Sequence, residues 1–255
     1  MIYKAKIPFT SSRNLKYGWG TSSLLHGLIM ESIDTEYAEI LHSGQLRVFS
    51  QSVISDTEIN YWIISTFSDE AYERILLPVL ALEKAEITQK DDIISFEKAE
   101  ITCTSFEKLF AEHYIANEPI RRLKLDFLTP ASFKAGGKYI NIPDPGLILS
   151  GLARRFDKDC DIHDTIYDTL FDEIEQRVAF SSFNIRSALF PVEQVRIPAF
   201  RGSVTLWISG NETFCRYINM ICEYASYSGI GIKTALGMGQ VDYSPLIKKE
   251  KEEIF

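Results

Sequence analysis

The first half of the chain alternates between strand-like and helix-like patterns of apolar residues. The clearest helix is the one in which Leu25, Leu28 and Ile29 recur at helical spacing. The expected elements are a strand at 1–8, this helix from a cap at Thr21 or Ser22 to about Ile33, a short helix from Asp34 to His42 with Gly44 as its C-terminal cap, strands at 46–53 and 59–67, a helix at 70–81 capped by Ser68 or Asp69, and strands at 83–89 and 93–103. The order strand, helix, strand, strand, helix, strand is that of a ferredoxin-like domain.

The same order recurs in the second half, with an insertion. The expected elements are a strand at 120–128 ended by Thr129-Pro130, a helix from Asp144-Pro145 to about Arg155, strands near 183–190, 193–200 and 203–209, a helix at 212–226 capped by Asn211, and a strand at 238–244. The predicted fold class is therefore α+β, with two tandem ferredoxin-like (βαββαβ) domains. We place them at residues 1–118 and 119–245, with a charged tail at 246–255.

The composition is that of a globular protein, with 45% hydrophobic and 24% charged residues. No stretch approaches the roughly 18 apolar residues of a membrane span, and the first residues lack the apolar core of a signal peptide. The four cysteines form no CxxC pair, and Cys215 and Cys222 are spaced to share one core-facing helix stripe. We therefore expect no disulfide framework, no zinc site, no contact with a membrane, and a cytoplasmic location.

The net charge of −8 argues against a nucleic-acid-binding protein, but the charge is unevenly distributed. Residues 120–155 contain seven basic side chains and two acidic ones, whereas residues 157–175 contain eight acids and one lysine. The basic residues are Arg121, Arg122, Lys124, Lys134, Lys138, Arg154 and Arg155. This segregation is consistent with a basic face on an otherwise acidic protein, or with ordinary solvated surface charge. Composition leaves both interpretations open.

A glycine-rich loop, residues 228–240, follows the last predicted helix. Its Gly229, Gly231, Gly237 and Gly239 form two G-x-G units around Lys233. A helix precedes the loop and a strand follows it, which is the reverse of the order in a dinucleotide-binding fingerprint, and the spacing is not that of a P-loop. Glycines let a backbone approach a partner and expose its N–H groups, and Lys233 can face a phosphate. A tight connection that needs glycine only for packing is the alternative.

With these segments the chain resembles the repeat-associated RNA-binding proteins of CRISPR systems, and within them the Cas-six endoribonucleases, most closely those of type III-A systems. The segments that carry the resemblance are Leu25-His-Gly-Leu-Ile-Met30, Ile40-Leu-His-Ser43, Phe127-Leu-Thr-Pro-Ala-Ser-Phe-Lys134 with Pro143-Asp144, Arg196-Ile-Pro-Ala-Phe-Arg-Gly202, and the glycine-rich loop. They are spaced in the family's order along both halves. The resemblance implies two ferredoxin-like domains and cleavage of precursor CRISPR RNA within its repeats, without metal or other cofactor, by attack of the RNA's own 2′-hydroxyl. The products would carry 5′-hydroxyl and 2′,3′-cyclic phosphate ends.

Such a reaction needs groups that remove and supply protons near neutral pH, and histidine suits both tasks. His42 matches the histidine after the first-domain helix of the family and is the main catalytic candidate. His26 matches a second histidine of some members, and the two can share the acid and base roles in either order. Arg47 lies near a catalytic lysine of some members and can stabilise phosphate charge. Met30 occupies the place of the family's helper tyrosine, which argues against a Tyr–His–Lys set. His113 and His163 are interpreted as non-catalytic.

The resemblance places RNA recognition mainly in the second domain and between the two. The candidate RNA-binding residues are Lys233, Gly229, Gly231, Gly237, Gly239, Lys134, Arg154, Arg155, Arg196 and Arg201. Arg154 and Arg155 can equally be a pairing with the end of their own helix. The expected partners are precursor CRISPR RNA repeats and a type III effector complex that receives the product, with no DNA, for a monomer or homodimer. The alternatives are a non-catalytic CRISPR RNA-binding subunit of the same fold, or a small-molecule enzyme that holds a nucleotide in the glycine-rich loop.

Overall fold

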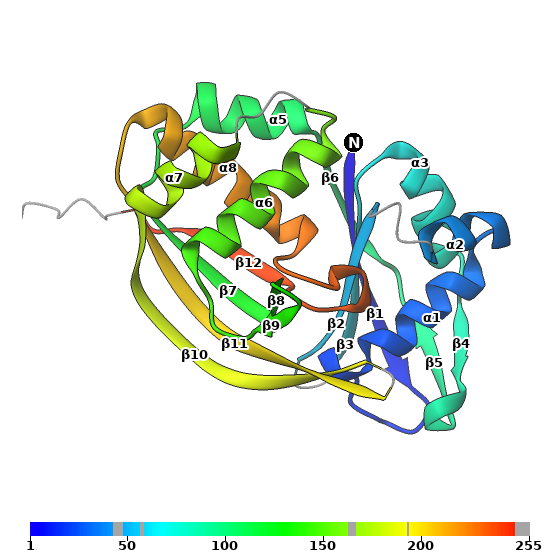
Figure 1. The fold of residues 1–255 in the computed structure, drawn as a ribbon. Coiled ribbons are helices and arrows are strands. Elements are labelled where there is room, and N and C mark those ends of the chain that lie inside the picture. Colours follow the sequence, from blue (N-terminus) through cyan, green and yellow to red (C-terminus); the bar gives the residue numbers. More distant parts are fainter. Residues whose placement is uncertain (43–47, 57–58, 163–166, 193, 248–255) are drawn as a thin grey trace, which may run out of the picture.

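The computed structural model describes residues 1–42, 48–56, 59–162, 167–192 and 194–247. Two antiparallel sheets stand side by side, each with helices against one face (Figure 1). The elements of the first half are β1 (Ile2–Ser11), η1 (Trp19–Thr21), α1 (Ser22–Ser32), α2 (Thr35–His42), β2 (Phe49–Ser55), β3 (Asn60–Thr66), α3 (Asp69–Ala71), η2 (Tyr72–Leu76), α4 (Leu77–Leu80), β4 (Lys84–Ile87), η3 (Thr88–Lys90), β5 (Asp92–Phe96), β6 (Glu100–Thr104), α5 (Phe106–Ala111) and η4 (Glu112–Ala116). Here η2 and η4 are single π-helical turns that continue α3 and α5.

The elements of the second half are β7 (Arg122–Ala131), β8 (Phe133–Ala135), β9 (Lys138–Ile140), α6 (Pro145–Asp159), α7 (Tyr167–Arg177), β10 (Val178–Val192), β11 (Val195–Ile208), α8 (Glu212–Ser228), η5 (Thr234–Leu236) and β12 (Val241–Pro245). No helix among the described residues is both long and apolar enough to cross a bilayer.

Both sheets have the strand order of a ferredoxin-like fold. In the second sheet the order is β10-β11-β7-β12, so the first strand lies between the third and the last. The first sheet repeats this with β2-β3-β1, and the other edge of β1 is shared by β6, which pairs with residues 2–6, and β5, which pairs with residues 9–11. The hairpin β4–β5 and the small hairpin β8–β9 are additions. The predicted α+β class with tandem ferredoxin-like folds is confirmed.

Local sequence signals account for most helix starts. The side chains of Ser68, Asp144 and Asn211 each accept a hydrogen bond from the backbone N–H three residues on, as N-cap residues do. Thr21 occupies the N-cap position of α1, but its hydroxyl instead donates to the Gly18 carbonyl. The Ser22 hydroxyl accepts from the Val53 N–H, and so ties the start of α1 to β2.

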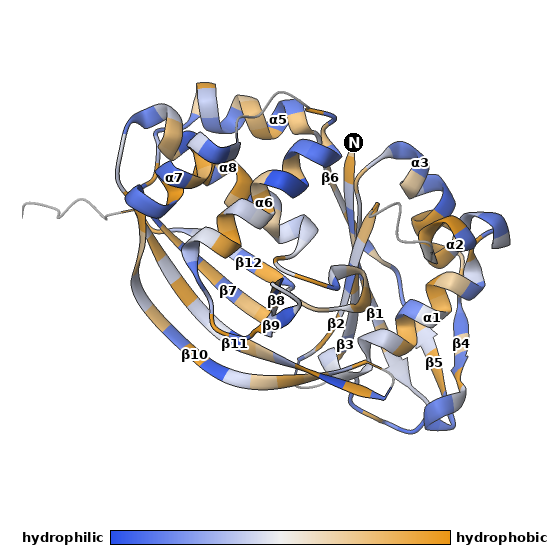
Figure 2. Ribbon diagram, viewed as in Figure 1, coloured by the Kyte–Doolittle hydropathy of each residue, from blue (hydrophilic) through white to orange (hydrophobic). Residues whose placement is uncertain are grey.

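Apolar faces of the helices and strands meet in the interior (Figure 2). One buried cluster lies between the first sheet and α1, and includes Leu25, Ile29 and Trp62. Another lies under α6 and α8, where Cys215 and Cys222 are both buried as their spacing predicted, and it also takes in Ile2 and Phe67 from the first half and Leu109 of α5. Elements of the two halves therefore share one core.

Several predicted boundaries were wrong. Strands expected at 193–200 and 203–209 are one strand, β11, in which Gly202 (φ 130°) crosses β10 so closely that a Cβ would lie 2.1 Å from the Asn184 carbonyl oxygen. β7 continues through Thr129-Pro130, because the register shift there leaves no ladder bond for the proline to make. The run at 93–103 is divided into β5 and β6. The helices at 106–116 and Tyr167–Arg177 were not predicted.

Asp92 is buried at the end of the first sheet among hydrogen-bond donors. Its carboxylate accepts from the hydroxyls of Ser11 (2.6 Å), Ser12 (2.8 Å) and Tyr17 (2.8 Å) and from the Arg13 N–H (3.2 Å). Burial by itself would raise the pKa of Asp92, but these hydrogen bonds outweigh it and lower the pKa to about 2. Since the folded pKa lies below the unfolded one of about 3.9, the ionised form stabilises the fold above pH 4.

We expect Asp92→Asn to lower the free energy of unfolding at pH 7 by about 2 kcal/mol, with the difference from wild type vanishing as pH falls from about 4 to about 2. Urea unfolding at several pH values measures this. Asp91→Asn is the matched control, because Asp91 is exposed in a left-handed conformation that asparagine tolerates. Equal pH profiles for Asp92→Asn and wild type would contradict the assignment.

Candidate active site and nucleic-acid interface

The glycine-rich loop is fixed to the end of β7. The Ile232 N–H donates to the Ser132 carbonyl (3.0 Å) and the Gly239 N–H to the Pro130 carbonyl (2.9 Å). Within the loop, the Ile230 N–H donates to the Gly239 carbonyl (2.8 Å). Ile230 and Met238 are each 1% exposed, so these apolar residues anchor the loop in the interior.

All four loop glycines have positive φ, and three are in very close contact with other parts of the chain. A Cβ would lie 2.4 Å from the Ser132 carbonyl oxygen at Gly231, 2.2 Å from the Ser22 Cβ at Gly237, and 1.9 Å from the Ile230 carbonyl oxygen at Gly239. These glycines thus allow close contact within the protein and not with a ligand. This supports the alternative that glycine is needed there for packing.

Part of the loop nevertheless presents backbone donors. The N–H groups of Gly229, Gly237 and Gly239 bond within the protein, whereas those of Gly231 and Lys233 have no acceptor among the described residues. Lys233 itself is exposed, with φ 55°, and its ammonium group has no partner in the described part of the chain. Gly231 and Lys233 are therefore the members of the loop that remain available to a ligand.

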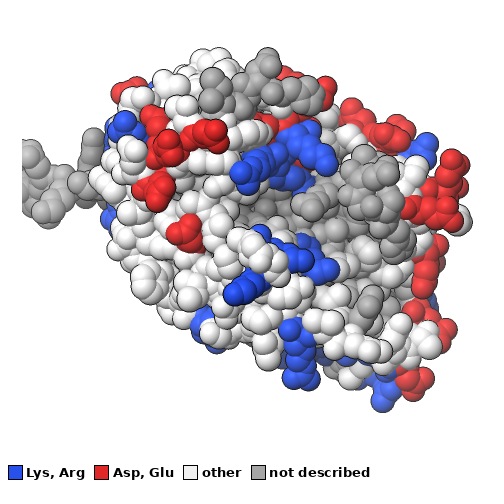
Figure 3. Space-filling model, viewed as in Figure 1, with Lys and Arg blue, Asp and Glu red and all other residues white. Residues whose placement is uncertain are grey.

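A groove of about 490 Å³ runs between α6, β8 and the glycine-rich loop. We call it the α6 groove; it is lined by Phe133, Lys134, Leu147, Ser150, Gly151, Leu152, Arg154, Arg155, Lys158, Ser228, Gly229, Gly231, Ile232 and Thr234. Lysine and arginine gather in the middle of this face of the molecule, with acidic residues around them (Figure 3). The predicted candidates Lys134, Arg154, Arg155, Gly229 and Gly231 do come together here, and they present positive charge to any ligand.

The basic side chains of the groove are not equivalent. The Arg155 guanidinium lies 2.5 Å from the Asp159 carboxylate and over the Phe67 ring (4.7 Å), and the Tyr224 hydroxyl donates to the same carboxylate. Arg155 is thus largely committed to joining α6 to the first sheet. Arg154 is exposed and stacks over Phe171 (4.5 Å).

Lys158 was not among the RNA-binding residues predicted from the sequence. It is exposed, lines the groove, and lies one helical turn after Arg154, so its i,i+4 spacing was the available signal.

His26 lies where the first half meets the glycine-rich loop. It follows Ser22, which touches Gly237, by one turn of α1, so the two side chains share a helix face about 6 Å apart along the axis. Its ring stacks on Phe49 at the start of β2, with centroids 6.0 Å apart. The turn η5 packs against both α1 and β2. The fold therefore brings the loop to His26, some 200 residues away in sequence.

The other catalytic candidates are only partly described. α2 ends at His42, as expected, but the side chain of His42 and the whole of Arg47 lie outside the described residues, as do Gly44 and His163. Arg196 and Arg201 lie on β11 and do not line the α6 groove. Arg196 is exposed opposite Pro191 near the end of the hairpin, and Arg201 is opposite Arg186.

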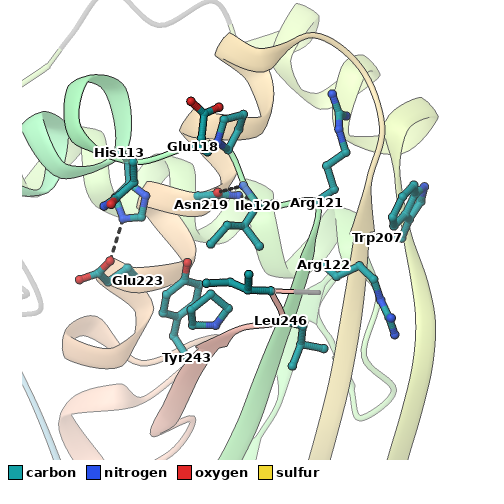
Figure 4. A pocket seen from close by; sticks show the side chains of 14 residues that line it. His113, Glu118, Ile120, Arg121, Arg122, Trp207, Asn219, Glu223, Tyr243 and Leu246 are labelled. Atoms are coloured by element: carbon teal, nitrogen blue, oxygen red, sulfur yellow. Dashed lines mark hydrogen bonds and ion pairs between the residues drawn. The ribbon is translucent and has the colours of Figure 1, made fainter. Parts of the chain in front are cut away.

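A further cavity, of about 610 Å³, lies beside α8 near Asn219 and Glu223 (Figure 4). Its lining is mainly apolar. His113, 8% exposed, contacts the Glu223 carboxylate there at 2.7 Å, which joins the π-turn after α5 to α8. His113 thus has a structural contact of its own, remote from His26 in the fold.

Comparison with known proteins agrees with this architecture. The family model described as CRISPR-associated endoribonuclease Cas6 matches residues 125–241. A CRISPR-associated endoribonuclease Cas6 of Mycobacterium tuberculosis is 33% identical over 89% of this chain and 73% of its own length. One of Streptococcus thermophilus is 28% identical over 92% of this chain and 96% of its own.

Solved structures show the same fold. Thermus thermophilus Cas6 superposes with a TM-score of 0.75 at 20% identity, over 96% of this chain and 98% of that one. Its product complex gives 0.77 at 21% identity, over 96% and 100%. The fold, its glycine-rich loop and these relatives lead to one conclusion: the chain belongs to the Cas6 family of CRISPR-associated endoribonucleases.

Proposed function

We propose that this chain cleaves precursor CRISPR RNA within its repeats, with the RNA held in the α6 groove and the reacting phosphate at the junction of α1, β2 and the glycine-rich loop. The observation that carries the proposal is this junction. There a groove bearing Lys134, Arg154 and Lys158 meets the loop that touches the helix of His26. A product complex and a substrate-mimic complex are known for proteins of this fold, which supports binding of a ligand by the fold.

The chemistry proposed is attack of the RNA's 2′-hydroxyl on the adjacent phosphorus, with departure of the 5′-oxygen. A base takes the hydroxyl proton and an acid protonates the leaving oxygen, giving 2′,3′-cyclic phosphate and 5′-hydroxyl ends. His42 and His26 supply these two functions. Negative charge that develops on the reacting phosphate is stabilised by three groups: the backbone N–H of Gly231, the Lys233 ammonium and the Arg47 guanidinium.

Cleavage of a labelled repeat RNA in excess EDTA tests the proposal. A substrate with a single 2′-deoxy nucleotide at the cut site should resist cleavage, because the nucleophile is missing. We expect cleavage of the all-ribose RNA in EDTA and none of the deoxy substrate. Tight binding without cleavage would instead identify a non-catalytic RNA-binding subunit of the same fold. We further propose a cytoplasmic enzyme, a monomer or homodimer, whose product passes to a type III effector complex.

Neutralising the groove should weaken binding through its interactions with phosphates. We expect Arg154→Gln with Lys158→Gln to reduce the slope of log affinity against log salt by about 0.7–0.9 for each phosphate that the variant no longer neutralises, and to lower affinity at 150 mM salt about tenfold. Filter binding across 50–300 mM salt measures this. Lys98→Gln, at an exposed bend between β5 and β6, is the control and should bind like wild type. An unchanged salt slope in the double variant would place the RNA elsewhere.

A further inference from the structure

No helix of the described part of the chain covers one face of the second sheet (Figure 1). Leu125 of β7 and Val204 of β11 are buried beneath α6 and α8. The alternating residues Lys124, Asp126, Arg201 and Ser203 point the other way, because side chains alternate along a strand. The register aligns rows on this open face: Arg186 with Arg201, then Asn184 with Ser203 and Asp126.

Two arginines stand directly opposite each other in this face. Arg186 on β10 and Arg201 on β11 are cross-strand partners, an arrangement in which like charges repel. Neither forms an ion pair with another described residue. Asp126, the acid of the next row, is already 2.8 Å from the Lys124 ammonium. The pKa of Arg201 is lowered by burial and then by Arg186, which agrees with a pair that lacks a counter-ion.

The pair borders a hollow of about 330 Å³ lined by Asp126, Phe127, Leu128, Asn184, Arg186, Arg201, Gly202 and Ser203. Gly202 shapes it, because any Cβ there would strike the Asn184 backbone. The side chains of Asn184 and Ser203 add neutral donors to the two guanidinium groups. This is a compact set of hydrogen-bond donors with excess positive charge, which is what an oxyanion requires.

An exposed aromatic residue on the same face indicates that the oxyanion is a phosphate of single-stranded RNA. Trp207, 45% exposed, lies six residues from Arg201 along β11, about 20 Å away at the usual strand rise. It is the cross-strand partner of Arg122. A phosphate site followed by a flat aromatic surface on an open sheet suits single-stranded RNA, whose bases stack on aromatic side chains.

We propose that the open face of the second sheet binds a single-stranded segment of the RNA, with a backbone phosphate between Arg186 and Arg201 and a base on Trp207. This rests on the proposed function, since it adds a second binding surface for the same RNA on the face of the sheet opposite the α6 groove. The segment would be one that flanks the part of the repeat held in that groove.

The test compares wild type, Arg186→Gln/Arg201→Gln, and the control Lys84→Gln/Lys98→Gln on the first half. Each is titrated with a full repeat RNA and with the same RNA lacking its single-stranded flanks. We expect the arginine variant to bind the full repeat about tenfold more weakly, with a salt slope reduced by about 0.7, for the one single-strand phosphate left without its two arginines. The short RNA should bind wild type and variant alike. The melting temperature should not fall, since a like-charge pair has been removed.

Each outcome separates the possibilities. If wild type binds the full repeat and the arginine variant binds it equally well, the open-face site is overturned while the proposed function stands. If wild type binds neither RNA, the proposed function fails. NMR of the arginine side chains during titration with inorganic phosphate tests the remaining alternative, that the site binds free phosphate. Shifts of Arg186 and Arg201 on phosphate addition, with RNA binding unaffected by their replacement, would mean a free-phosphate site and overturn the RNA assignment.

Discussion

Replacing His42 with alanine is expected to slow cleavage of a repeat RNA by about 10²–10⁴-fold, the usual cost of losing a general acid or base. Affinity for the RNA should stay within about twofold, because a catalytic proton donor or acceptor contributes little to ground-state binding. The assignment rests on the resemblance to the family, in which His42 matches the histidine after the first-domain helix. Single-turnover cleavage with enzyme in excess measures the effect apart from binding.

Two further histidine variants make the result decisive. His163→Ala should cleave like wild type, since this histidine is assigned no role. Cleavage that survived His42→Ala but was lost in His26→Ala would transfer the main role to His26. His26 lies on α1, the helix that contacts the glycine-rich loop, and its ring stacks on Phe49 of β2. Loss of cleavage in both variants is the result expected if the two share acid and base roles.

The second large effect should come from Gly239→Ala. A Cβ at this position would lie 1.9 Å from the Ile230 carbonyl oxygen, and the residue has φ 70°. Overpacking and a left-handed conformation together should lower the free energy of unfolding by about 3 kcal/mol. RNA affinity should fall as well, because the loop must move away from Ile230 and so displace Gly231 and Lys233. Urea unfolding and filter binding measure the two effects.

Gly151→Ala is the matched control for this substitution. Gly151 lies in the middle of α6 on the wall of the groove, and a Cβ there would meet nothing within 4 Å. Alanine should therefore stabilise the protein by about 0.5–1 kcal/mol, as in other helix interiors. If Gly239→Ala were as stable as wild type, the loop would have to be far more adaptable than its close packing allows.

The sequence patterns predicted the repeated strand and helix order because both halves follow simple periodicities. One of the unpredicted helices, at 106–116, had a usable signal: Ser105 caps it, and Phe106, Leu109 and His113 recur at helical spacing. The break expected at Gly202 was a different kind of error. Glycine ends a strand or allows a close crossing of strands, and only the pairing of β11 with β10 decides between these.

The candidate site was predictable to a similar degree. Charge and glycine patterns identified the loop and the basic residues of α6, and the fold does bring them together. That Arg155 is bound to Asp159 and Phe67 while Arg154 is exposed depends on which face of α6 meets the first sheet. The pairing of Arg186 with Arg201 depends on strand register. Neither could be read from spacing along the chain.

The shared core has a consequence for how the protein is made. Ile2 and Phe67 of the first half are buried in the same cluster as Leu152 and Tyr224 of the second. Without the second half these first-half residues would lose their cover, and we expect denaturation to be one cooperative transition. A chain emerging from the ribosome has to wait for α8 before this shared cluster is complete. A prematurely terminated chain should thus be degraded, and would not persist as a fragment that occupies repeats without cutting them.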